Sequence, residues 1–122
     1  MGALVSRWWL QQGGGRGRVG TFVSLSGPHR GTLMAWPLSM LPGVRQMRPG
    51  SPFLQALAAD PDPWGTTRVH CLYTPFDAMI VPATSSILPG ARSVEAIRVP
   101  IHRLMLSDRR VLDAVAACLR EA

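Results

Sequence analysis

The sequence contains no lysine, so all thirteen of its basic residues are arginines, against only seven acidic residues. The resulting net charge of +6 would suit a nucleic-acid ligand. The arginines are scattered, however, and only Arg16 with Arg18 and Arg109 with Arg110 lie close together. The four tryptophans do not alternate with them as base-stacking residues would. We therefore do not expect nucleic acid as a partner.

Long apolar runs and closely spaced metal ligands are also missing. No hydrophobic run approaches the roughly 20 residues that cross a bilayer, so no transmembrane segment is expected. Arg7 interrupts the apolar N-terminal stretch, which does not have the pattern of a signal peptide. No histidine or cysteine pair has the spacing of a zinc site, so a metal is not expected. We expect no other cofactor either. Cys71 and Cys118 are interpreted as buried free thiols, although the sequence does not decide whether they pair.

Hydrophobic residues are plentiful: they make up 47% of the 122 residues, enough for one small domain. Helical spacing predicts a helix over residues 3–12, which the glycine-rich run 13–18 ends. A C-terminal helix is predicted to begin at Ser107 or Asp108. Three segments have the length and composition of strands, at residues 19–26, 66–74 and 93–99. Because helical segments separate these strands, we expect an α/β fold with a parallel sheet.

Residues 27–63 have a different composition from the rest of the chain. They contain seven prolines and three methionines, and one short helical stretch is expected over residues 51–59. An irregular segment of this length inside a domain is often functional. We interpret it as a lid-like insertion over an apolar pocket, although its apolar residues could equally pack on the core. The candidate pocket-lining residues are Met34, Trp36, Leu38 and Met40.

Two polar residues follow the second and third predicted strands. Asp77 lies in the apolar segment after the second strand, and His102 follows the third. Functional residues of open α/β sheets collect at the carboxyl ends of strands. Asp77 followed by His102 matches the last two members of the Ser, Asp, His order of α/β-hydrolases. His29 is the rival base but precedes the insertion, and His70, in mid-strand, is interpreted as a packed or edge histidine.

Four segments carry a resemblance to a known family. Met1 and Gly2, followed at once by a helix, match the end of a G-x-S-x-G nucleophile elbow whose serine would lie just before Met1. The other three are Ser-Gly-Pro-His-Arg-Gly-Thr (26–32), Phe-Asp-Ala-Met-Ile-Val-Pro (76–82) and Val-Pro-Ile-His (99–102). In this order and spacing, nearly the whole chain resembles the C-terminal half of a bacterial lipase or esterase of the α/β-hydrolase superfamily. One departure is Ile101, because the family commonly has glycine there.

The resemblance implies carboxylic ester hydrolysis, with an ester or lipid substrate and an acyl-enzyme intermediate. His102 would be the base, Asp77 would hold its tautomer, and the backbone N–H of Met1 would form half of the oxyanion hole. Residues 1–122 would be a partial α/β-hydrolase domain of about three parallel strands with flanking helices. Its N-terminal half, with the nucleophile, would be missing through a true truncation or a start assigned at an internal methionine. We therefore expect the chain alone to be inactive, and do not expect a partner chain to supply that half.

A second class of function is a non-catalytic remnant or a small interaction module. Such a protein would use the Pro/Met/Trp-rich surface of residues 27–63 to dock on a partner. Ester turnover by a longer version of the chain distinguishes this class from the hydrolase.

Overall fold

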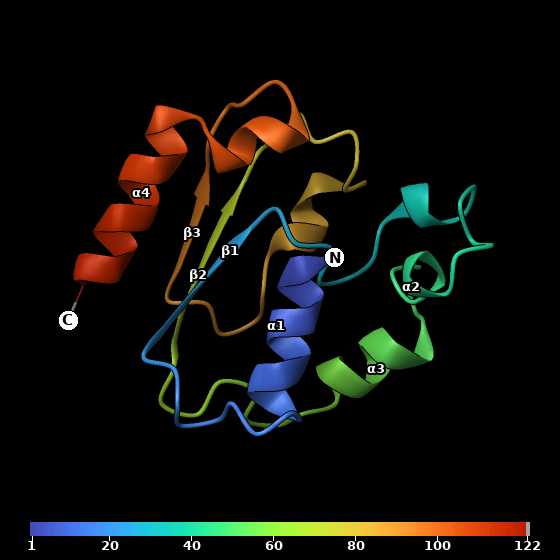
Figure 1. Cartoon of the computed structure of the whole chain (residues 1–122), viewed down its shortest axis with the longest axis horizontal. Coiled ribbons are helices and arrows are strands. Elements are labelled where there is room, and N and C mark those ends of the chain that lie inside the picture. The colour runs from blue at the N-terminus through green and yellow to red at the C-terminus, as the bar shows by residue number, and fades with distance from the viewer. Residues whose placement is uncertain (122) are drawn as a thin grey trace.

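A computed structural model describes residues 1–121 and contains a three-stranded parallel sheet with helices around it (Figure 1). The strands are β1 (Thr21–Leu25), β2 (Arg68–Tyr73) and β3 (Ser93–Ala96), and they lie in the order β1-β2-β3. Thr21 pairs with Arg68, and His70 pairs with Ser93. The predicted α/β architecture with parallel strands is confirmed.

The strands are shorter than the sequence predicts, because the backbone leaves the ladder early. Ser26 ends β1 with a positive φ of 46°, although its N–H still donates to the carbonyl of Leu72. β3 ends at Ala96, three residues before the predicted end. The N–H of Val99 bonds to the carbonyl of Ile97 and to Oγ1 of Thr74 instead of continuing the ladder. Each strand therefore runs directly into an irregular turn at its carboxyl end.

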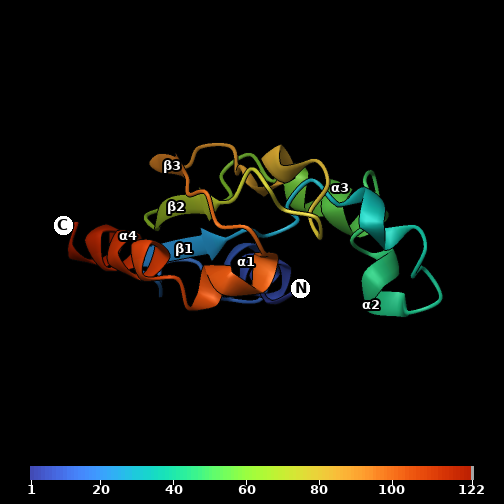
Figure 2. The same ribbon diagram turned by 90° about the horizontal axis from the view of Figure 1, so that it is seen from above.

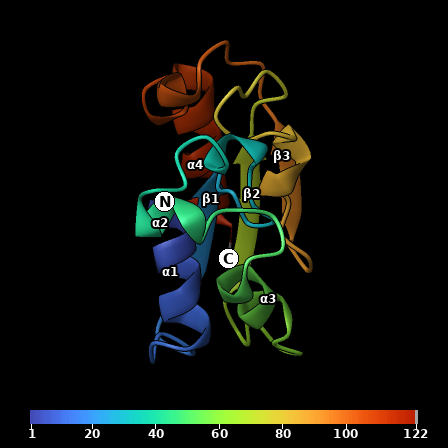
Figure 3. The ribbon, with the colours of Figure 1, turned by 90° about the vertical axis from the view of Figure 1, so that its right-hand side faces the viewer.

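Two layers of helix cover the sheet. α4 (Arg109–Arg120) packs on one face, against Val23 and Leu25 of β1 and Leu72 of β2. α1 (Gly2–Gln11) and α3 (Pro52–Ala58) pack together on the opposite side (Figures 1 and 3). None of the helices in residues 1–121 is long and apolar enough to span a bilayer.

Side-chain caps fix where two of the predicted helices begin. Ser51 caps α3, since its Oγ accepts from the N–H of Leu54, and Pro52 occupies the first turn. Asp108, one of the two predicted caps, starts α4 by accepting from the N–H of Arg110. The insertion contains two further short helices that were not predicted: η1 (Leu33–Ala35) and α2 (Pro42–Arg45). Figure 2 shows that α2 projects beyond α3, away from α4.

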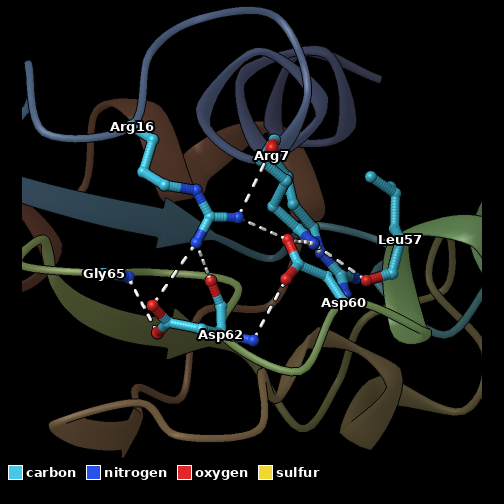
Figure 4. Close-up of polar contacts among 7 residues, drawn as sticks. Arg7, Arg16, Leu57, Asp60, Asp62 and Gly65 are labelled. Carbon is cyan, nitrogen blue, oxygen red and sulfur yellow. Dashed lines mark hydrogen bonds and ion pairs between the residues drawn. The ribbon is translucent and has the colours of Figure 1, made fainter.

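A polar cluster joins the glycine-rich turn after α1 to the loop after α3 (Figure 4). Arg16 Nη2 lies 2.7 Å from Asp60 Oδ2, and its Nη1 lies 3.5 Å from Asp62 Oδ2 and bonds to the Asp62 carbonyl. Gln11 Nε2 donates to the carbonyl of Leu57 at 2.9 Å and to Asp60 at 3.2 Å. The cluster therefore holds the end of α1 against the end of α3.

We expect Arg16→Gln to lower the free energy of unfolding by about 0.5–1 kcal/mol at pH 7. The expected effect is small because the Arg16–Asp60 ion pair is partly exposed to solvent. Burial raises the pKa of Asp60, but hydrogen bonds from Gln11 and the Asp62 backbone, with the charge of Arg16, outweigh burial and hold it below 3.8. The depressed pKa makes the pair stabilising above about pH 4, and this contribution is lost as the pH falls lower. Urea unfolding should show the effect of Arg16→Gln shrinking below pH 4. Arg18→Gln, the control, removes an exposed charge that forms no ion pair within residues 1–121, and it should change little.

Candidate active site

Asp77 occupies a tight turn after β2, where backbone donors fix its carboxylate. Its Oδ1 accepts the N–H groups of Met79 and Ile80, each at 2.8 Å. The side chain is only 1% exposed. These two bonds leave Oδ2 free to accept from a second group. The turn therefore fixes the direction of one carboxylate oxygen at the carboxyl end of the sheet.

His102 provides that second group. It begins the 3₁₀ helix η3 (His102–Leu106), and its Nδ1 lies 2.7 Å from Asp77 Oδ2. We assign the proton to Nδ1, because the carboxylate can only accept. In the neutral imidazole, Nε2 is then unprotonated and available to take a proton. Ile101 has an extended backbone, with φ of −133°, so this position does not require a glycine.

The imidazole, one-third exposed, borders two adjoining cavities. The first, of about 380 Å³, extends from His102 to the N-terminus of α1 at Met1 and Gly2, and to Ser26 after β1. The second, of about 180 Å³, is largely apolar and is also lined by Met1 and His102. The histidine and the N-terminus of α1 therefore open onto the same space.

The four candidate lid residues fall into two groups. Met34 and Leu38 line the smaller cavity together with His102. Trp36 lies under the guanidinium of Arg48, with the Arg48 Cζ 4.3 Å from its ring centroid, and lines neither cavity. Met40 also lines neither and is 90% exposed. Part of the insertion thus borders the histidine, and part points into solvent.

Met1, the candidate oxyanion donor, caps α1. Its carbonyl accepts from the N–H groups of Leu4 at 2.9 Å and Val5 at 3.2 Å. The positive end of the α1 dipole therefore faces the cavity that His102 borders. Such an end favours negative charge, as developing oxyanions have.

A buried serine–histidine pair beneath this cavity was not predicted. Nε2 of His29 lies 2.6 Å from Oγ of Ser24, and its Nδ1 has no partner within residues 1–121. Arg7 Nη1 donates to the His29 carbonyl at 3.1 Å. Burial, with the positive charges of Arg7 and the amino terminus, lowers the pKa of His29 to about 3. The only sequence signal for this pair was the alternation of side chains along β1, which places Ser24 on the face of the strand that α1 covers.

The remaining candidates for chemistry have structural contacts. His70 is completely buried, as predicted for a packed histidine, with Nδ1 2.7 Å from Ser93 Oγ. Both cysteines are free: Cys71 is buried as predicted, whereas Cys118 is only half-buried because it lies on the partly covered face of α4. Within residues 1–121, no group of three or more His, Cys, Asp and Glu side chains is placed to hold a metal ion.

Neither a protein-family model nor a curated protein sequence matches the chain. The class of protein therefore rests on the structure itself. The chain is an α/β protein with a parallel sheet, in which a buried carboxylate is bonded to a histidine that borders a cavity.

Proposed function

We propose that Asp77 and His102 are the acid and base of a Ser-Asp-His carboxylic ester hydrolase. The observation that carries the proposal is the 2.7 Å bond between His102 Nδ1 and Asp77 Oδ2, made by an imidazole that shares a cavity with the N-terminus of α1. A strand-to-helix nucleophile elbow would place its serine just before such a helix. The resemblance of four segments to the lipase and esterase branch of the α/β-hydrolases supports the same assignment.

The hydroxyls already in the cavity are poorly suited as the nucleophile. Ser24 is buried, and burial lowers the pKa of its partner His29 to about 3, which makes His29 a weak base. The Oγ of Ser26 is buried, and Ser6, on the exposed side of α1, has no side-chain hydrogen bond within residues 1–121. Within residues 1–121, no hydroxyl or thiol hydrogen-bonds to His102, as an activated nucleophile would. We therefore place the nucleophilic serine in sequence preceding Met1, and expect residues 1–122 alone to lack ester turnover.

The proposed reaction proceeds in two steps. As the serine Oγ attacks the ester carbonyl carbon, His102 Nε2 accepts the serine proton, and Asp77 stabilises the resulting imidazolium. His102 then gives that proton to the alcohol oxygen as the carbon–oxygen bond to the alcohol breaks, which leaves an acyl-enzyme. A water molecule, deprotonated by His102 in its turn, releases the carboxylic acid and restores the serine.

The proposal is tested by expressing the chain together with the residues encoded in frame before Met1. We expect this longer protein to hydrolyse p-nitrophenyl butyrate and to be labelled by a fluorophosphonate at a serine just before Met1. Residues 1–122 should do neither. The matched control replaces that serine with alanine, which should abolish both turnover and labelling.

A stop codon directly upstream, or a folded longer protein without turnover and labelling, would refute the proposal. The second class, a non-catalytic interaction module, would then gain support. The exposed Trp36 and Met40 favour that class, because neither lines the His102 cavities.

A further inference from the structure

The tip of the insertion, residues 33–41, is an exposed apolar surface. Trp36 is 55% exposed, Leu38 57% and Met40 90%, and Leu33 and Leu41 are also exposed. The segment projects from the body on the side away from α4 (Figures 1 and 2). Apolar side chains gathered on such a projection indicate a contact surface.

Arginines surround this tip without acidic partners. Residues 1–59 contain no aspartate or glutamate. Arg45 Nε donates to the Ser39 carbonyl at 3.3 Å, and Arg48 Nε donates to Ser39 Oγ at 2.8 Å. Within the described chain, neither arginine forms an ion pair. The apolar tip is therefore bordered by uncompensated positive charge, held beside it by Ser39 and by the stacking of Arg48 on Trp36.

We propose that residues 33–48 dock on the surface of an anionic lipid bilayer. The apolar tip would enter the boundary between headgroups and acyl chains, where tryptophan is favoured, and Arg45 and Arg48 would contact lipid phosphates and carboxylates. A nucleic acid would use the arginines but leave the apolar side chains in water. The combination of an exposed apolar tip and unpaired cations favours the bilayer. Met34 and Leu38 of this segment line the smaller cavity beside His102, but Trp36, Met40 and the two arginines line neither His102 cavity, so docking through them does not depend on the proposed hydrolysis.

The test is co-sedimentation of the full 122-residue chain with vesicles. We expect at least tenfold tighter binding to phosphatidylcholine vesicles containing roughly one third phosphatidylserine than to pure phosphatidylcholine. Binding should weaken between about 0.1 M and 0.5 M salt, since screening shortens the range of the attraction. Arg45→Gln with Arg48→Gln should weaken it by roughly 30-fold, and Met40→Ser by several-fold.

Matched controls use the opposite end of the molecule. Arg98→Gln with Arg109→Gln removes the same charge, and Leu119→Ser removes an exposed apolar side chain of α4. Both controls should bind within about twofold of the unmodified chain. All variants change exposed or half-exposed side chains, and far-UV circular dichroism should confirm that their folds are unchanged.

Three results would overturn the proposal. One is equal binding to neutral and anionic vesicles, and another is an equal loss in the control pair and the Arg45/Arg48 pair. The third is tighter binding to a short DNA duplex that depends on Arg45 and Arg48 but is unaffected by Met40→Ser. That pattern would identify the surface as a nucleic-acid site instead.

Discussion

Asp77→Asn is expected to lower kcat for ester hydrolysis by about 10⁴ in the protein that includes the upstream serine. Asparagine can keep its Oδ1 on the N–H groups of Met79 and Ile80, so the turn should remain folded. Its amide then points an N–H donor at His102 Nδ1, which must become the acceptor. The ring proton moves to Nε2, and His102 can no longer take the proton of the serine.

The tautomer switch can also be measured in residues 1–122 alone. Nitrogen NMR shifts should identify Nδ1–H in the unmodified chain and Nε2–H in Asp77→Asn. Asp113→Asn, an exposed change on α4, should alter neither the tautomer nor kcat. If Asp77→Asn kept full activity with an unchanged tautomer, Asp77 would not be the partner that orients His102.

Acid is expected to destabilise the fold through His29, well above the range in which carboxylates titrate. The pKa of His29 is about 3 in the native state, against 6.5 when unperturbed. Between these values the unfolded chain binds more protons, so the stability present above pH 6.5 falls as the pH is lowered towards 3. The loss between pH 6.5 and pH 4.5 should be about 2 kcal/mol. The physical cause is that a second ring N–H would be buried beside Arg7 with no acceptor.

Urea unfolding at several pH values measures this dependence. His29→Gln should flatten the stability curve between pH 6.5 and pH 4.5, because its amide can bond to Ser24 but does not titrate. Arg30→Gln alters the exposed neighbour and should keep the slope of the unmodified chain. A carbon-bound imidazole proton of His29 that titrates near pH 6.5 would contradict the assignment.

The elements with strong local signals were predictable from the sequence. α1 and α4 follow helical spacing, and Ser51 and Asp108 act as the caps that their residue types suggest. The short helices α2 and η1 were missed because three or four residues are too few to show a period. The strand ends were predicted too late, since the positive φ of Ser26 and the bonds of Thr74 depend on tertiary contacts.

The candidate site was predictable only in part, for a similar reason. Asp77 and His102 both follow strands of one parallel sheet, so topology alone brings them to the same edge. The side-chain directions of Trp36 and Met40 could not be predicted, because they lie in an irregular segment without the regular side-chain periodicity of a helix or strand. The Ser24–His29 bond spans a turn whose shape becomes evident only when the loop is folded.

The pairing of Thr21 with Arg68 has a consequence for the order of events during synthesis. β1 leaves the ribosome well before β2, its only partner strand in the described sheet. At about 5–20 residues per second, β1 would wait on the order of several seconds for the last residue of β2. During this interval the backbone groups that β1 later bonds to β2 lack that partner, and Val23 and Leu25 are not yet covered by α4. We therefore expect the nascent chain to need protection, such as that of a ribosome-associated chaperone, until Tyr73 has emerged.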